Sequence, residues 1–293
     1  MAFPFCANNV NNTIISFCKI KAGLLITLFI RKRFAMTHTI LPVASSPKIL
    51  SIDIGGSNVK AILLDASGQS LMEYQKLETP QPSTPENVVN TIVQLAQRFP
   101  GYDKVSAGFP GYVKNGIVQT APNLGTDYWR DTDLTEMLSS RLGKPAKVVN
   151  DADLQGLGIA KGNGFEIVAT LGTGFGTAFL NNGVLLPHIE FAHHPVSKER
   201  DYDEYIGDKA FLEIGEERWN KRMKKVLAIL KTVFNYDHLY LGGGNAKRLR
   251  FKLDDNISIV SNREGIKGGA RLWVNEDGNM KSEVGSQMSE AEV

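Results

Sequence analysis

From Lys48 onward, short apolar runs alternate with glycine-rich or polar turns. The runs 49–54 and 59–64 flank the turn 55–58, and the runs 167–171 and 178–180 flank Gly172 to Thr177. Two apolar runs around a tight polar turn are typical of a β-hairpin. The pattern therefore predicts one glycine-rich hairpin near the start of the globular region and a second one after its middle.

Between and after these hairpins, the pattern predicts alternating helices and strands. Thr84 is expected to cap a helix from Pro85 to about Phe99, which has apolar residues at helical spacing. A third strand is expected at 69–76, and a hairpin at 112–118 turns at Asn115-Gly116. Further strands are predicted at 105–109, 146–149, 238–241 and 256–260, and further helices at 133–142, 152–161, 208–234 and 266–273.

Candidate chemistry lies where these elements meet. The strand at 146–149 delivers Asn150 and Asp151 at its C-terminal end, where ligands collect in open α/β sheets. The alternating glycines from Gly172 to Gly176 can bring backbone N–H groups close to an anion. A carboxylate beside a phosphate loop indicates phosphoryl transfer, although one glycine-rich turn alone is more often a plain turn. Asp151 could also simply stabilise a helix N-terminus.

Composition is that of an ordinary globular protein, with 42% hydrophobic and 22% charged residues among 293, enough for about two domains. The two cysteines, Cys6 and Cys18, both lie near the N-terminus. Because no cysteine follows Cys18, the body of the chain can form neither a disulfide framework nor a cysteine-rich zinc site. This composition suits a reducing compartment.

Residues 1–47 differ from the rest because they contain five Lys or Arg and no Asp or Glu. Their apolar stretch, 22–30, is too short to span a bilayer. It could be sequence translated ahead of a start at Met36, a targeting peptide or a membrane-surface anchor. We favour the first because the globular pattern begins at Lys48. The expected division is an extension at 1–47, α/β lobes at 48–160 and 161–274, and a polar tail at 275–293.

These motifs resemble those of the ROK family of sugar kinases, which has the two-lobed, actin-like, hexokinase-type ATPase fold. The segment Asp53 to Lys60 is similar to the first phosphate motif, Gly172 to Thr177 to the second, and Leu241 to Asn245 to the nucleotide-side motif. The segments 79–85 and 182–191 resemble the polyphosphate glucokinase branch. The resemblance runs from about Lys48 to Trp273 and implies an α/β fold with a cleft between its lobes.

The resemblance also implies roles for individual residues. Asp151 matches the general base that accepts the proton of the sugar 6-hydroxyl, and Asp53 matches the carboxylate that helps place Mg²⁺. The expected sugar contacts are Asn123, Asn150, Glu190 and His193. The expected phosphate-binding residues are Gly55, Gly56, Ser57, Asn58, Lys60, Gly172, Thr173, Gly174, Gly176, Gly242, Gly243 and Gly244. Ala192 replaces a glycine of the Glu-x-Gly-His motif, a change that can move His193.

The implied activity is transfer of a phosphoryl group from polyphosphate, ATP or both to the 6-hydroxyl of glucose, with Mg²⁺ and without zinc. A strictly ATP-dependent glucokinase or another hexose kinase is the alternative. A non-catalytic sugar-binding regulator is an alternative of another class, but residues 1–47 show no paired-helix pattern. We expect a cytoplasmic homodimer that binds neither nucleic acid nor membrane.

Several polar residues also have ordinary interpretations. His188, His194 and Lys60 are interpreted as structural or surface residues, and His193 could be a packed histidine. The basic positions 218, 221, 222, 224 and 225 on the predicted helix 208–234 indicate a solvated helical face. A track for a polyanion such as polyphosphate is the functional alternative.

Overall fold

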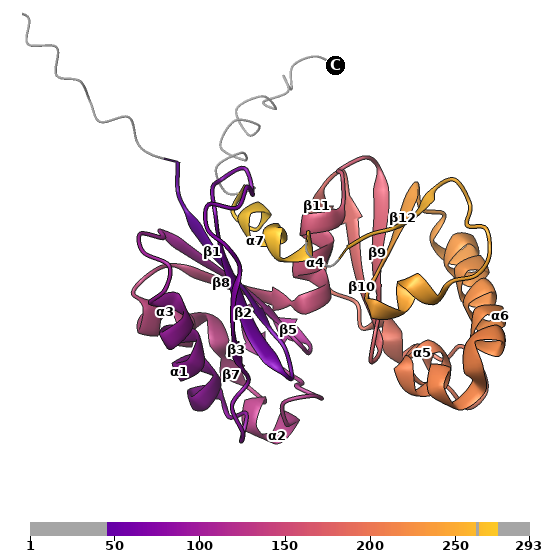
Figure 1. The fold of residues 1–293 in the computed structure, drawn as a ribbon, viewed down its shortest axis with the longest axis horizontal. Helices are drawn as coiled ribbons and strands as arrows, with labels where there is room; N and C mark the ends of the chain where they lie inside the picture. Colours follow the sequence, from indigo (N-terminus) through magenta and orange to yellow (C-terminus); the bar gives the residue numbers. More distant parts are fainter. Residues whose placement is uncertain (1–45, 262–263, 275–293) are drawn as a thin grey trace, which may run out of the picture. The chain divides into compact units, whose positions relative to one another are not determined.

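The computed structural model describes residues 46–261 and 264–274, and within them two five-stranded sheets form the framework (Figure 1). The predictions for the N-terminal extension before residue 46 and for the tail from residue 275 lie outside the described residues. No helix within the described ranges is long and apolar enough to cross a membrane.

The first sheet has the order β3-β2-β1-β4-β8, in which β1 pairs antiparallel with β2 and parallel with β4. The strands are β1 (Ile49–Ile54), β2 (Asn58–Leu64), β3 (Gln75–Glu78), β4 (Lys104–Phe109) and β8 (Ala146–Asn150). The helices α1 (Pro85–Ala96) and α3 (Leu134–Leu142) pack against it. A small sheet of β5 (Val113–Lys114), β6 (Ile117–Val118) and β7 (Thr132–Asp133) and the short α2 (Thr126–Trp129) complete this part of the chain.

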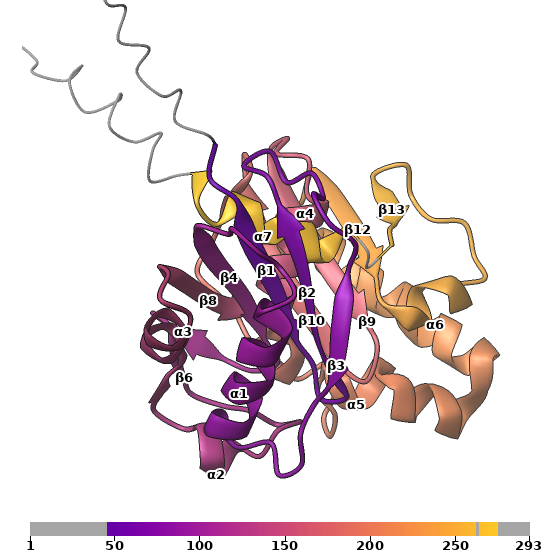
Figure 2. The ribbon, with the colours of Figure 1, turned by 60° about the vertical axis from the view of Figure 1, so that its left-hand side comes forward.

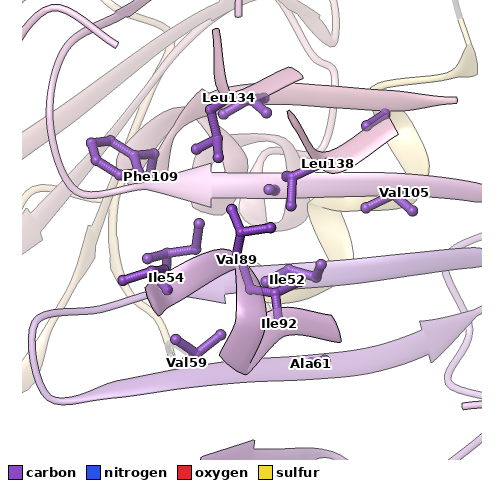
Figure 3. Packing of buried hydrophobic residues seen from close by; sticks show 14 of the residues in the cluster. Ile52, Ile54, Val59, Ala61, Val89, Ile92, Val105, Phe109, Leu134 and Leu138 are labelled. Atoms are coloured by element: carbon purple, nitrogen blue, oxygen red, sulfur yellow. The ribbon is translucent and has the colours of Figure 1, made fainter. Parts of the chain in front are cut away.

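The alternating pattern of β1 is explained by its two faces. Ile52 and Ile54 pack with Val89 and Ile92 of α1 in a buried cluster (Figure 3). Ser51 lies between the apolar positions and donates from Oγ to the Ile266 carbonyl oxygen at 2.5 Å. One face of the strand is therefore an apolar core, and the other meets the C-terminal part of the chain.

The second sheet has the order β11-β10-β9-β12-β13. Its strands are β9 (Phe165–Leu171), β10 (Phe175–Asn181), β11 (Val184–Leu185), β12 (His238–Gly242) and β13 (Ile257–Ile259). The other helices of this region are η1 (Phe191–His193), α5 (Tyr202–Ile206), α6 (Asp208–Phe234) and η2 (Gly244–Arg248). Buried residues of α6, including Trp219 and Met223, share a core cluster with Ile167 of β9.

The helix α4 (Asp151–Ile159) contacts both large sheets, and the last described segment returns to the first one. That segment comprises η3 (Gly265–Lys267) and α7 (Gly268–Arg271), which lies beside β1 and β4 (Figure 2). Ser106 donates from Oγ to the Gly269 carbonyl at 2.6 Å, and Trp273 donates from its indole to Ser106 at 2.8 Å. A Cβ on Gly269 would lie 2.2 Å from the Ser51 hydroxyl, so this close approach requires glycine.

Three predicted elements differ from the structure. The helix predicted at 266–273 is a 3-10 helix, η3, followed by the four-residue α7. The third strand was expected at 69–76, but β3 spans Gln75–Glu78. Asp65 accepts hydrogen bonds from the backbone of Ser67 and Gln69, which turns the chain after β2 and delays the next strand. The helix predicted over 208–234 is present, but Gly215 interrupts it with φ 77° and ψ 167°.

Candidate active site

A cavity of about 370 Å³ lies where residues of both large sheets converge. Pro110 and Gly111 follow β4, and Asn150 and Asp151 mark the end of the parallel strand β8. Other lining residues come from the β9–β10 turn and from the start of η2. The cavity therefore has the position predicted for a ligand site, beyond the carboxyl ends of parallel strands.

Asn150 and Asp151 are held by the N-terminus of α4. Asn150 caps the helix, because its Oδ1 accepts from the Ala152 N–H at 2.8 Å, and its Nδ2 donates to the Gly111 carbonyl at 3.0 Å. Asp151 Oδ1 accepts from the same Ala152 N–H at 2.8 Å. The amide of Asn150 thus fixes the backbone on which the Asp151 carboxylate enters the cavity.

The environment of Asp151 strongly favours its protonated form. Burial, followed by the negative charges of Asp53, Asp153 and Glu190, raises the pKa of Asp151 to about 7, against the opposing effect of the Ala152 N–H. A carboxylate with a pKa near neutrality can accept a proton in one step and release it in the next. Asp151 is therefore suited to general base chemistry.

The turn between β9 and β10 supplies the predicted glycine loop. Gly172, Thr173, Gly174 and Gly176 all line the cavity, as do Gly243 and Gly244 after β12. Gly243 has φ 87°, and a Cβ there would lie 2.0 Å from the Leu171 carbonyl oxygen. Gly172 has open space around its hypothetical Cβ. The fold therefore requires a glycine at position 243, whereas at position 172 only a ligand in the cavity could require one.

Asp203 of α5 also lines the cavity, beside this loop. Its Oδ1 accepts from the Phe175 N–H at 2.6 Å, and burial raises its pKa. The residue was not predicted, because 28 residues separate it from Phe175 and no motif includes it.

The first glycine turn lies near the cavity without lining it. A Cβ on Gly56 would lie 3.5 Å from the Asn123 Cβ, and Asn123 is part of the cavity wall. The Gly55 N–H bonds to the Asn58 carbonyl at 3.0 Å and closes the turn. The predicted phosphate contacts at Gly55, Gly56, Ser57, Asn58 and Gly242 are thus not brought into the cavity wall.

Asp53 and Lys60 line a neighbouring cavity of about 630 Å³, which shares Gln155 with the first. Their side chains form an ion pair at 2.9 Å, and the pair raises the pKa of Lys60 despite the opposing effect of burial. Asp53 is also close enough to Asp151 to raise the pKa of that carboxyl. The two predicted carboxylates are therefore electrostatically coupled.

The predicted sugar contacts Glu190 and His193 lie together on the cavity wall. Glu190 is half-buried, whereas the side chain of His193 is 66% exposed and its Nδ1 lies 3.3 Å from Asp201 Oδ2. Asn123 and Asn150 line the same cavity. Their contacts with a sugar stay a prediction.

His188, interpreted from the sequence as an ordinary residue, also lines this cavity. Its Nδ1 lies 2.8 Å from Asp153 Oδ2 and its Nε2 lies 3.2 Å from Glu190 Oε1. The sequence contained one signal of this arrangement, since Asp153 follows Asp151 by two residues and Glu190 follows His188 by two. The pairing across 35 residues depends on the fold.

The basic face of α6 lies outside the cavity. Lys221 pairs with Glu217 at 2.8 Å, and Arg222 donates to the Tyr205 carbonyl at 2.9 Å. Lys224 lies over the Phe251 ring at 5.2 Å from its centroid. These local partners are those of an ordinary helical surface, and none of these three cations lines the cavity.

Comparison with known proteins places this chain in a family. Residues 49–189 match the ROK family. The polyphosphate glucokinase of Mycobacterium leprae is 34% identical over 228 residues, covering 75% of this chain and 69% of that protein. The polyphosphate glucokinase of Mycobacterium tuberculosis is 33% identical over 224 residues, covering 73% of this chain and 83% of that protein.

A solved structure agrees with the sequence relatives. The crystal structure of the inorganic polyphosphate/ATP-glucomannokinase from Arthrobacter sp. strain KM superposes with a TM-score of 0.68 at 29% identity, covering 79% of this chain and all of that one. The predicted hexokinase-type α/β fold is thereby confirmed. From the matched residues, the two relatives and this structure, we conclude that the chain belongs to the ROK family.

Proposed function

We propose that the chain transfers a phosphoryl group from polyphosphate, ATP or both to the 6-hydroxyl of glucose, giving glucose 6-phosphate. The observation that carries the proposal is Asp151, a buried carboxylate with a pKa of about 7 that shares one cavity with the glycine loop 172–176. Two relatives named polyphosphate glucokinase support the choice of substrates.

In this function Asp151 accepts the proton of the sugar hydroxyl as the phosphoryl group arrives. A positioned base of this kind contributes roughly 10²- to 10⁴-fold to the rate. Asn123, Glu190 and His193, which line the same cavity, hold the other hydroxyls and orient the reacting oxygen. Much of the acceleration then comes from positioning, because phosphoryl transfer needs little covalent help from the protein.

The glycine loop holds the donor. Gly172 and Gly244 have open space where a side chain would be, so a phosphate can approach the backbone closely. Phosphate charge is met there by backbone N–H groups and by the hydroxyl of Thr173, which lines the cavity. The donor and Asp151 would thus meet the sugar in the same cavity.

The chain's residues fit the Mg²⁺ that such a donor requires. Mg²⁺ in kinases is commonly held by one or two carboxylates together with substrate phosphates. Asp53 is close enough to Asp151 to raise the pKa of that carboxyl, so an ion at Asp53 would lie near the proposed base. Lys60, which pairs with Asp53 at 2.9 Å, would compete with the ion for this carboxylate. Asp53 would hold the ion, which shields the donor's charge when bound.

The experiment that tests the function measures glucose 6-phosphate formation with polyphosphate and with ATP, side by side, with Mg²⁺ and after chelation. Product with polyphosphate, lost on chelation, is the expected result. Product with ATP alone would leave the ATP-dependent glucokinase as the function. No product with either donor, from a folded protein that binds glucose, would favour the non-catalytic regulator.

A further inference from the structure

The His188 imidazole lies between two carboxylates that come from different parts of the fold. Asp153 belongs to the first turn of α4, and Glu190 follows β11, in the loop that leads to η1. The two nitrogen–oxygen distances are 2.8 Å and 3.2 Å. The side chains of His188 and Asp153 are only 8% and 5% exposed, whereas Glu190 is 36% exposed toward the cavity. The three groups connect α4 to the cavity wall.

The groups around His188 favour its charged form. Burial alone would favour the neutral ring, but the carboxylates of Asp153 and Glu190 outweigh it and raise the pKa of His188 to about 9. The Tyr112 ring stacks on the His188 imidazole, with 5.8 Å between the two ring centroids. A neutral imidazole has one N–H, so only the charged ring presents an N–H to each carboxylate.

The two contacts are unequal, and the difference suits sugar binding. The Asp153 contact is a hydrogen bond, whereas the Glu190 contact is an ion pair whose geometry is not that of an aligned hydrogen bond. Asp153 therefore anchors the ring, while Glu190 is attracted without losing its capacity to accept hydrogen bonds from hydroxyls. His188 also lowers the pKa of Glu190 and keeps it ionised.

We propose that His188 is a positioning residue for the sugar: anchored to α4 by Asp153, it holds the Glu190 carboxylate at a fixed place relative to Asp151. The inference rests on the proposed function. The helix α4 begins at Asp151 and has Asp153 in its first turn. It can therefore position both Asp151 and, through Asp153 and His188, Glu190 relative to the same sugar. His188 itself acts through Glu190.

The first test compares His188→Gln with the matched control His194→Gln. His194 belongs to the same segment and stacks on Phe191, but it does not line the cavity. For His188→Gln we expect the KM for glucose to rise about tenfold, kcat to fall by less, and the KM for the donor to stay within about twofold. His194→Gln should leave all three within about twofold. An unchanged glucose KM in a folded His188→Gln protein would overturn the proposal.

A double-mutant cycle separates positioning from general destabilisation. If His188 acts through Glu190, the His188→Gln/Glu190→Gln protein should have the same glucose KM, within about twofold, as Glu190→Gln alone. Fully multiplicative effects would contradict that dependence. Asp153→Asn should raise the glucose KM in the same direction. Calorimetric glucose binding without donor gives the same comparison independently of phosphoryl transfer.

A third measurement uses the wild-type protein, so it does not depend on the folding of a variant. Nitrogen NMR of the labelled imidazoles in the wild-type chain should show His188 with both nitrogens protonated at about pH 7.5. The glucose affinity should weaken as the pH rises through the His188 pKa of about 9, in a step separate from any change near pH 7 that comes from Asp151. A neutral His188 ring at pH 7.5 would overturn the proposal, even if the kinase activity is established. If the wild type binds no glucose, the proposed function fails instead.

Discussion

Asp151 is the residue where the proposed catalytic role and stability conflict most directly. Its carboxylate is buried near Asp53, Asp153 and Glu190, which raises its pKa from 3.8 to about 7. The folded state therefore binds the proton more tightly than the unfolded chain does. Between these two pH values the free energy of unfolding falls as the pH rises, and above about pH 7 the full penalty is present.

Replacing this carboxylate should lower activity sharply while the fold persists. We expect Asp151→Asn to reduce kcat by roughly 10²- to 10⁴-fold, because the amide cannot accept the hydroxyl proton. Glucose binding without donor should remain measurable by calorimetry. A variant whose kcat stays within about threefold of wild type would exclude Asp151 as the general base.

The same substitution should stabilise the protein at high pH. The amide removes a buried charge, and each pKa unit corresponds to about 1.4 kcal/mol, so we expect a free energy of unfolding about 2–4 kcal/mol higher at pH 8. The gain should shrink toward zero at about pH 4, where both chains carry little charge at this position. Urea unfolding of both proteins at the two pH values measures it, and a gain that is independent of pH would contradict the explanation.

At the scale of elements, a glycine in the β9–β10 loop and one after β12 are expected to serve different ends, ligand binding and folding. Gly172 has open space around its hypothetical Cβ, whereas a Cβ on Gly243 would lie 2.0 Å from the Leu171 carbonyl at a φ of 87°. We expect Gly172→Ala to fold with an unchanged melting temperature and to raise the donor KM several-fold, because the methyl group blocks the approach of phosphate.

Gly243→Ala, the same substitution at a glycine that the fold requires, is the comparison for Gly172→Ala. It should lower the free energy of unfolding by at least about 1–2 kcal/mol, because a left-handed backbone and a steric clash coincide there. Thermal melts and donor titrations of both variants distinguish the two effects. Equal melting temperatures for the two variants would show that the segment after β12 relaxes around a side chain.

Local pattern was sufficient for most elements and for part of the site. Thr84 caps α1 as predicted, and Asp133 caps α3 in the same way, because N-capping depends on neighbours three residues away. The break in α6 at Gly215 was not predictable, because a single glycine is tolerated within a helical pattern. The cluster of His188, Asp153 and Glu190 arises from folding across 35 residues and carries no local signal of comparable strength.

At the scale of the whole molecule, the described core begins at Ile49. The four buried clusters of the described residues lie between Ile49 and Trp273. We therefore expect a chain that starts at Met36 to fold and to keep the glucose kinase activity of the full chain. Circular dichroism and the donor assay test this, and loss of folding would show that the first 35 residues pack against the domain.

The return of the last segment to the first sheet also has a consequence for synthesis. Ser51 of β1 and Ser106 of β4 bond to Ile266 and Gly269, and Trp273 bonds to Ser106. During translation Ser51 and Ser106 thus lack these partners, and β1 and β4 lack the cover of α7, until residues 265–273 have emerged from the ribosome. A nascent chain stalled before that point should expose β1 and β4 to chaperones and proteases, so completion of the first sheet depends on the last part of the described chain to be made.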